Sequence, residues 1–178
     1  MNNKKIKEEF IKNFGVEKWE QEEMLGKLIP IQIDLCEYLG IEMLPVVCED
    51  IPDDSRFYIK DQYIALSPKM FKSYTDAIKS LVHESRHQFQ IKCVLSEECD
   101  IDPLLVEMWR EDFLNMNAPL DVNSSSSVEK YFNQVIELDA HAFSKWYLKE
   151  ILFIETHFPS EEYDKLIDLY IEKNKRNF

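Results

Sequence analysis

Two histidines and a glutamate stand close together near the middle of the chain. Residues 80–90 read SLVHESRHQFQ, so His83, Glu84 and His87 form the pattern H-E-x-x-H. On a helix His83 and His87 lie about 40° apart around the axis, so both side chains share one face and can meet one metal ion. Glu84 lies about 60° from His87, near enough to hold a water molecule without itself binding the metal. The spacing therefore predicts a zinc site that carries its own base.

Such a site has a definite chemistry. Catalytic zinc takes three protein ligands and leaves one position open for water. The ion lowers the pKa of that water to about 7, and a neighbouring carboxylate, here Glu84, takes the proton as the water attacks a peptide carbonyl. Arg86, inside the motif, is expected to pair with a carboxylate, because a cation beside a metal ion is otherwise unfavourable. The alternative is a partly buried helix on which His83 and His87 have only structural partners.

A third ligand has to come from elsewhere in the chain. Gln90 and Cys93 occupy the positions where one class of such sites carries a glycine and a third histidine, so that class is excluded. The stretch ELDAHAF, residues 137–143, offers two carboxylates on another predicted helix. Glu137 and Asp139 lie about 200° apart around that helix, so they are rivals for the metal. Asp139 lies within an apolar stripe, and a buried aspartate there could instead hold one of the histidines.

The two stretches together resemble the gluzincin type of zinc metallopeptidase. Its members carry HExxH and, on a later helix, a glutamate ligand with a polar residue four positions on. Alanine and phenylalanine are frequent at the third and sixth positions after that glutamate, and Glu137, Ala140, His141 and Phe143 match this pattern. The resemblance implies that Glu137 is the third zinc ligand. His141 stands where Asp, Glu or Asn is usual, and it either supports the site or competes as a ligand.

The matched stretches, 79–90 and 131–144, also resemble small ImmA/IrrE-type and phage- or mobile-element-borne zincins, and locally the anthrax lethal-factor catalytic domain. In that last group a tyrosine just before the glutamate-bearing helix stabilises the oxyanion. Tyr131 lies one residue nearer to Glu137 than the family position, so it is either such a donor or a core aromatic. The resemblance implies a zinc-dependent metallopeptidase that hydrolyses peptide bonds. The alternative, from another class, is a non-catalytic metal-binding scaffold that acts by binding a protein.

The rest of the pattern predicts the elements that position these residues. Helices are expected over residues 3–14, 17–39, 74–93, 103–116, 133–153 and 160–175, and strands over 42–49, 56–60 and 63–67. Pro30 should kink or split the second helix. Ser73, with Asp76 three residues later, marks the start of the motif helix. The last strand, 63–67, is either an edge to which an extended peptide adds or an interior strand. We therefore expect an α+β domain over 1–178, mostly helical, with a small sheet packed against the HExxH helix.

The composition and the net charge indicate which partners and which compartment to expect. The chain has 178 residues, enough for one domain, and a net charge of −13. An acidic surface repels phosphate backbones and anionic lipids, so we expect no nucleic acid and no membrane partner, and a neutral or basic peptide fits better. No apolar stretch follows the basic start MNNKKIKEEF, so a cytoplasmic protein is expected. Cys36, Cys48, Cys93 and Cys99 form no CxxC pair and are expected to be free thiols there.

Overall fold

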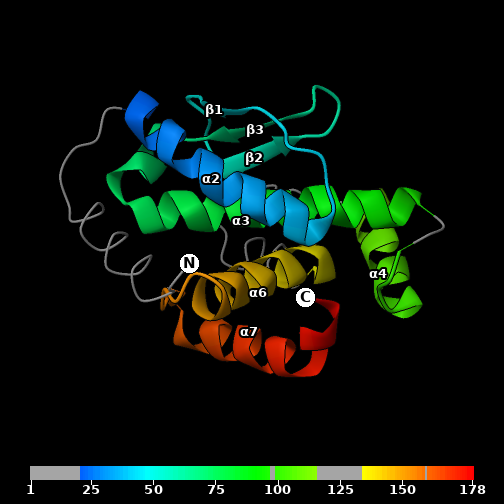
Figure 1. The fold of residues 1–178 in the computed structure, drawn as a ribbon. Helices are drawn as coiled ribbons and strands as arrows, with labels where there is room; N and C mark the ends of the chain where they lie inside the picture. Colours follow the sequence, from blue (N-terminus) through cyan, green and yellow to red (C-terminus); the bar gives the residue numbers. More distant parts are fainter. Residues whose placement is uncertain (1–20, 97–98, 116–133, 159) are drawn as a thin grey trace.

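The fold is mostly helical with one small sheet, which confirms the α+β prediction (Figure 1). The computed structural model describes residues 21–96, 99–115, 134–158 and 160–178, so the helix expected over 3–14 lies outside the described residues. In chain order the elements are α2 (Gln21–Leu39), β1 (Val46–Cys48), β2 (Ser55–Tyr58), β3 (Tyr63–Leu66), η1 (Pro68–Lys72), α3 (Tyr74–Leu95), α4 (Pro103–Leu114), α6 (Val135–Glu150), α7 (Glu161–Asn174) and η2 (Lys175–Asn177). Every helix in the described ranges is too short or too polar to cross a lipid bilayer.

Helix α3, which carries the HExxH motif, is the central element (Figure 1). The sheet and α2 lie on one side of it, α6 lies on the other side, and α7 packs on α6. The helix begins where its cap predicts, because the Ser73 side chain accepts a hydrogen bond from the backbone N–H of Asp76 at 3.3 Å. The main core contains Leu28, Leu35, Ile64, Leu66, Ile78, Leu81, Phe143 and Tyr147. Because both sides of α3 are covered, even its polar residues Glu84, Arg86 and Gln90 are buried.

The sheet has the strand order β1-β3-β2. As predicted, β2 and β3 form an antiparallel hairpin, and Gln62 in its turn has a left-handed φ of 56°. Strand β1 pairs with β3 in parallel. Strand β3 is therefore interior, and the hypothesis that 63–67 is an open edge for a peptide was wrong. The physical reason is its composition: Ile64, Ala65 and Leu66 are all fully buried, a continuous apolar run that needs cover on both faces.

Pro30 does not split α2, which runs without a break from Gln21 to Leu39. The residue four positions before it, whose carbonyl the proline ring crowds, is Gly26. Gly26 and Pro30 both lie on the exposed face of the helix. The opposite face holds the helix in the core through Met24, Leu28, Ile31, Leu35 and Leu39.

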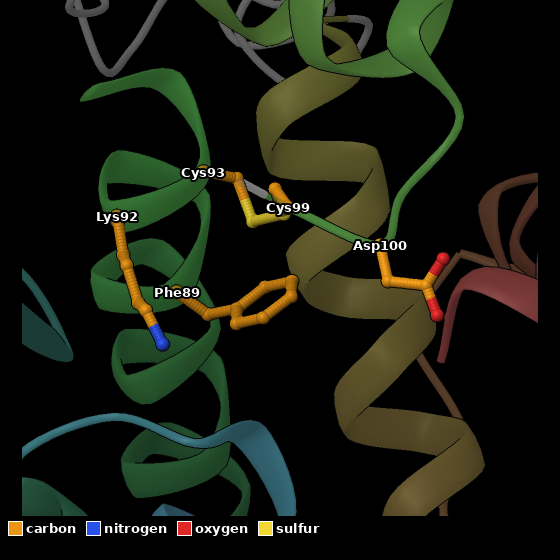
Figure 2. A pocket seen from close by; sticks show the side chains of 5 residues that line it. All are labelled: Phe89, Lys92, Cys93, Cys99 and Asp100. Atoms are coloured by element: carbon orange, nitrogen blue, oxygen red, sulfur yellow. A yellow bond between two sulfur atoms is a disulfide. The ribbon is translucent and has the colours of Figure 1, made fainter. Parts of the chain in front are cut away.

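Two of the cysteines form a disulfide, shown in Figure 2: Cys93, near the end of α3, and Cys99. The expectation of free thiols was therefore wrong for this pair, whereas Cys36 and Cys48 are free. The two Cα atoms lie 5.3 Å apart, a proximity that the spacing of six residues did not reveal. The bond closes the connection from α3 to α4, and Trp109 of α4 packs in the same apolar cluster as Cys93.

Candidate metal centre

The three side chains expected to bind a metal lie together between α3 and α6. The Nε2 atoms of His83 and His87 are 3.0 Å apart. The Glu137 carboxylate lies 3.4 Å from His83 Nε2 through Oε2 and 3.5 Å from His87 Nε2 through Oε1. The side chains of His83, His87 and Glu137 are only 12%, 11% and 2% exposed. The structure thus brings two imidazole nitrogens and one carboxylate into a sheltered triangle.

The three ligand groups of this triangle are close enough together to hold one metal ion. Zinc–nitrogen bonds of about 2.0–2.1 Å at a tetrahedral angle separate two ligand atoms by about 3.3 Å. The two imidazole nitrogens lie 3.0 Å apart, and each lies 3.4–3.5 Å from a different oxygen of the Glu137 carboxylate, close to that value. The Oε2 atom of Glu137 is buried and makes no hydrogen bond of ordinary geometry with the described residues, a deficit that a cation would remove. The donor set fits zinc, and it also suits other divalent metals, so the geometry supports a metal ion without naming it.

The same side chains set one another's charge. Burial alone would raise the pKa of Glu137, but the charges of His87 and His83 outweigh it and hold that pKa well below its ordinary value. Burial lowers the pKa of His87, but the Glu137 carboxylate raises it more, and the result is a pKa of about 9. In the metal-free chain His87 is therefore protonated at neutral pH, and a metal ion must displace that proton.

The position of Glu137 depends on how α6 begins. Gln134 precedes the helix but makes no side-chain cap. Instead, the Asp112 side chain of α4 accepts a hydrogen bond from the backbone N–H of Ile136 at 3.0 Å. Glu137 lies in this first turn, where the helix dipole favours a negative charge. Helix α4 therefore holds the helix end that presents Glu137, a role for Asp112 that the sequence did not reveal.

Glu84 lies beside the triangle but is not one of its three members. Its carboxylate raises the pKa of His87, which places its charge near the cluster. The hydroxyl of Ser55, the first residue of β2, donates a hydrogen bond to Glu84 Oε1 at 2.7 Å. An edge strand of the sheet thus holds a buried carboxylate next to the metal-ligand group. No pattern in the sequence links Ser55 to Glu84, because the contact joins a strand to a helix that follows it much later.

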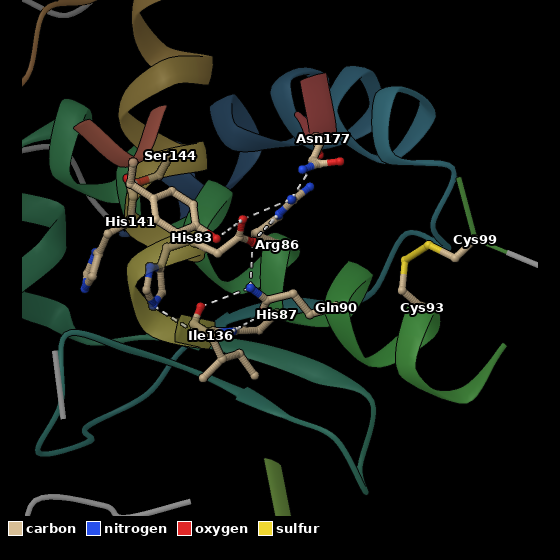
Figure 3. A network of polar contacts seen from close by, with 12 residues as sticks. His83, Arg86, His87, Gln90, Cys93, Cys99, Ile136, His141, Ser144 and Asn177 are labelled. Carbon is tan, nitrogen blue, oxygen red and sulfur yellow. Dashed lines mark hydrogen bonds and ion pairs between the residues drawn. A yellow bond between two sulfur atoms is a disulfide. The ribbon is translucent and has the colours of Figure 1, made fainter. Parts of the chain in front are cut away.

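Asp139 pairs with Arg86 rather than with a histidine. Arg86 donates from Nε to Asp139 Oδ2 at 2.8 Å and from Nη2 to Oδ1 at 3.3 Å, which confirms that Arg86 has a carboxylate partner. The hypothesis that Asp139 itself holds a histidine was wrong. Nδ1 of His87 contacts Gln90 Oε1 at 2.8 Å, and Gln90 Nε2 donates to Asp139 Oδ2 at 2.8 Å (Figure 3). Gln90 therefore lies between His87 and Asp139. From the sequence alone, Gln90 was notable only because it occupies the position of a glycine in another class of zinc site.

His141 lies next to the triangle without belonging to it. Its ring centroid is 4.3 Å from that of His83, with the planes tilted by 36°. Burial and the neighbouring charge of His83 hold the pKa of His141 well below its ordinary value, so the ring is neutral. Among the described residues the possible metal-ligand group contains His83, His87 and Glu137, so the geometry does not favour His141 as a competing ligand. Tyr131, the expected oxyanion donor, lies outside the described residues.

Comparisons with known proteins add no relative. No protein-family model, no curated protein and no solved structure matches the chain. The geometry of the described residues and the local likeness of the two motifs are therefore the observations that bear on function.

Proposed function

We propose that this protein is a zinc-dependent metallopeptidase that hydrolyses peptide bonds in a peptide or protein substrate. The observation that carries the proposal is the cluster of His83, His87 and Glu137 with a separate carboxylate, Glu84, beside it. A purely structural zinc site needs no such carboxylate and normally takes a fourth protein ligand. The resemblance of HESRH and ELDAHAF to the gluzincin motifs supports the same function.

Each side chain has one role in this proposal. His83, His87 and Glu137 hold the ion, and zinc bound there would polarise a peptide carbonyl and acidify a water molecule. Glu84 takes the proton of the attacking water and then delivers it to the leaving amine. Ser55 holds Glu84 through its hydrogen bond, so that the carboxylate stays in one orientation during both transfers.

The partner and the compartment belong to the same proposal. The net charge of −13 favours a neutral or basic peptide over nucleic acid or an anionic membrane. Tyr131 keeps its proposed role as an oxyanion donor on the resemblance alone. The cytoplasm is the proposed compartment. The Cys93–Cys99 bond counts against it, because disulfides persist mainly in oxidising compartments. Cell fractionation with a tagged chain tests the compartment, and thiol alkylation of the same fractions tests whether the Cys93–Cys99 bond forms there.

Metal content and peptide cleavage test the function together. We expect wild-type protein to hold about one zinc ion per chain, and Glu137→Ala to lose it. We expect wild-type protein to cleave members of a peptide library. Glu84→Gln should keep its zinc and lose cleavage by roughly 10²–10⁴-fold, the range of a general base. His157→Gln is the matched control, because His157 is 76% exposed and lies outside the cluster.

The outcomes separate the two functions named above. Zinc bound at the site without cleavage of any peptide would favour the scaffold that binds another protein. A wild-type chain that neither contains zinc nor is stabilised by added zinc would refute both.

A further inference from the structure

A network of buried hydrogen bonds starts from Nδ1 of His87, whereas Nε2 of the same ring faces His83 and Glu137 (Figure 3). Nδ1 of His87 is 2.8 Å from Gln90 Oε1. Gln90 Nε2 donates to Asp139 Oδ2 at 2.8 Å and to the backbone carbonyl of Ile136 at 3.0 Å. Gln90 and Asp139 are both 0% exposed. The network is therefore shielded from water, so the protein groups alone determine which atom donates and which accepts in each hydrogen bond.

The direction of the Gln90 amide follows from its partners. The carbonyl of Ile136 can only accept a hydrogen bond. Asp139 is bound by Arg86 through two hydrogen bonds, and because a guanidinium is always charged, its partner is a carboxylate, which also only accepts. The NH₂ group of Gln90 must face these two acceptors, because a flipped amide would point its oxygen at them. The Gln90 oxygen must then face His87.

This arrangement decides which nitrogen of His87 can bind a metal ion. A glutamine oxygen can only accept, so Nδ1 of His87 must donate the hydrogen bond. When the ring is neutral and its proton is on Nδ1, the lone pair is on Nε2. Nε2 lies 3.0 Å from His83 Nε2 and 3.5 Å from Glu137 Oε1, inside the ligand triangle. Nδ1 of His83 has no such hydrogen-bond partner among the described residues, so the network acts on one ligand only.

We propose that Gln90 is a positioning residue that holds His87 in the tautomer and orientation needed to bind a metal ion, and that the buried Arg86–Asp139 pair fixes Gln90. The end of the described chain reinforces the pair. Tyr170 of α7 donates to Asp139 Oδ1 at 3.3 Å, and the carbonyl of Asn177 accepts from Arg86 Nη2 at 3.1 Å. The functional meaning of this inference rests on the proposed metallopeptidase, but the tautomer of His87 is a property of the metal-free chain as well.

The first experiment removes the amide at nearly constant size. Gln90→Met keeps the length of the side chain and removes its hydrogen bonds. Gln88→Met is the matched control, because Gln88 lies on the same helix and its amide donates to the Glu42 carbonyl at the surface. Zinc affinity is measured by competition with a chromogenic chelator, and the histidine tautomer by NMR of ¹⁵N-labelled protein.

We expect Gln90→Met to raise the dissociation constant for zinc about 10–100-fold, the usual effect of removing a group that orients a metal ligand. In Gln90→Met the Nδ1 proton of His87 should no longer be protected from exchange with water, whereas it should stay protected in wild-type protein and in Gln88→Met. An unchanged dissociation constant for zinc in Gln90→Met would overturn the inference.

A conservative variant distinguishes positioning from a general loss of structure. In Gln90→Glu a carboxyl oxygen takes the place of the amide oxygen that faces Nδ1 of His87. That oxygen still accepts from His87, although the carboxyl group cannot replace both hydrogen bonds that the amide donates to Asp139 and the Ile136 carbonyl. We expect Gln90→Glu to recover the His87 tautomer and most of the zinc affinity lost in Gln90→Met. Recovery of neither would show that the hydrogen bond to His87 is not what matters.

The tautomer of His87 in metal-free wild-type protein tests this inference independently of the proposed function. The pH of metal-free protein is raised until the His87 ring is neutral, and NMR then reports its tautomer without any metal. A proton on Nδ1 in wild-type protein, lost in Gln90→Met, would support the positioning role even in a chain that binds no zinc, and then only the proposed function would fail. A proton on Nε2 in wild-type protein would overturn the inference, whether or not zinc binds.

Discussion

The buried pair of Arg86 and Asp139 leads to the first prediction, which concerns how α3 is held against α6. Arg86 is 1% exposed and Asp139 is 0% exposed. Apart from Asp139, the guanidinium has a hydrogen bond to the carbonyl of Asn177. Its central carbon lies 4.7–5.5 Å from the ring centroids of Phe89, Trp109, Phe143 and Phe178. Asp139→Asn would remove the carboxylate and leave the guanidinium buried among these rings.

The magnitude follows from the burial of the pair. Breaking a buried ion pair by removing one partner costs about 3–5 kcal/mol. The aromatic faces and the Asn177 carbonyl keep some attraction for the guanidinium, so we expect Asp139→Asn to lower the free energy of unfolding by about 3 kcal/mol. In a chain of this length each 1 kcal/mol shifts Tm by roughly 2–4 °C, so Tm should fall by roughly 6–12 °C.

Urea unfolding of the metal-free protein, followed by circular dichroism, measures this loss without any contribution from ligand binding. Lys165→Gln is the control: it breaks an exposed pair with Glu161 at 2.8 Å and should leave the free energy of unfolding almost unchanged. The double variant Arg86→Met with Asp139→Leu should lose less stability than Asp139→Leu alone, because no charge is left unpaired. A loss from Asp139→Asn as small as that from Lys165→Gln would refute the reasoning.

Ser55→Ala removes the hydrogen bond to Glu84 and should lower kcat for peptide cleavage about tenfold with zinc content unchanged; an unaltered kcat would contradict the role given to Ser55. Zinc affinity should rise about tenfold per pH unit up to the His87 pKa of about 9, because below that pH the ion displaces one proton from His87. Competition with a chelator measures this affinity, and a dissociation constant independent of pH below 9 would exclude that exchange. Reduction of the Cys93–Cys99 bond should lower the free energy of unfolding by about 2 kcal/mol, the closure entropy of so short a loop. Urea unfolding with and without reductant measures it, and coincident curves would argue against the bond.

The sequence by itself determined the local elements of this protein. The cap at Ser73 and the apolar periodicity placed the HExxH helix, so that His83 and His87 had to share a face. The two-residue gap at 61–62 predicted the hairpin, and the apolar stripe around Asp139 predicted that its side chain is buried. These rules act over a few residues, and burial on both sides of α3 did not disturb them.

Only the tertiary structure decided which distant groups meet. Two carboxylates, two residues and about 200° apart on their helix, were rivals for the metal until the packing of α6 on α3 put Glu137 beside the histidines and Asp139 beside Arg86. The same packing inserted Gln90 between His87 and Asp139. The strand order β1-β3-β2, like the Cys93–Cys99 bond, also went unpredicted. The physical reason is that such contacts depend on how elements remote in the chain cross and turn, and no periodicity within one element encodes that angle.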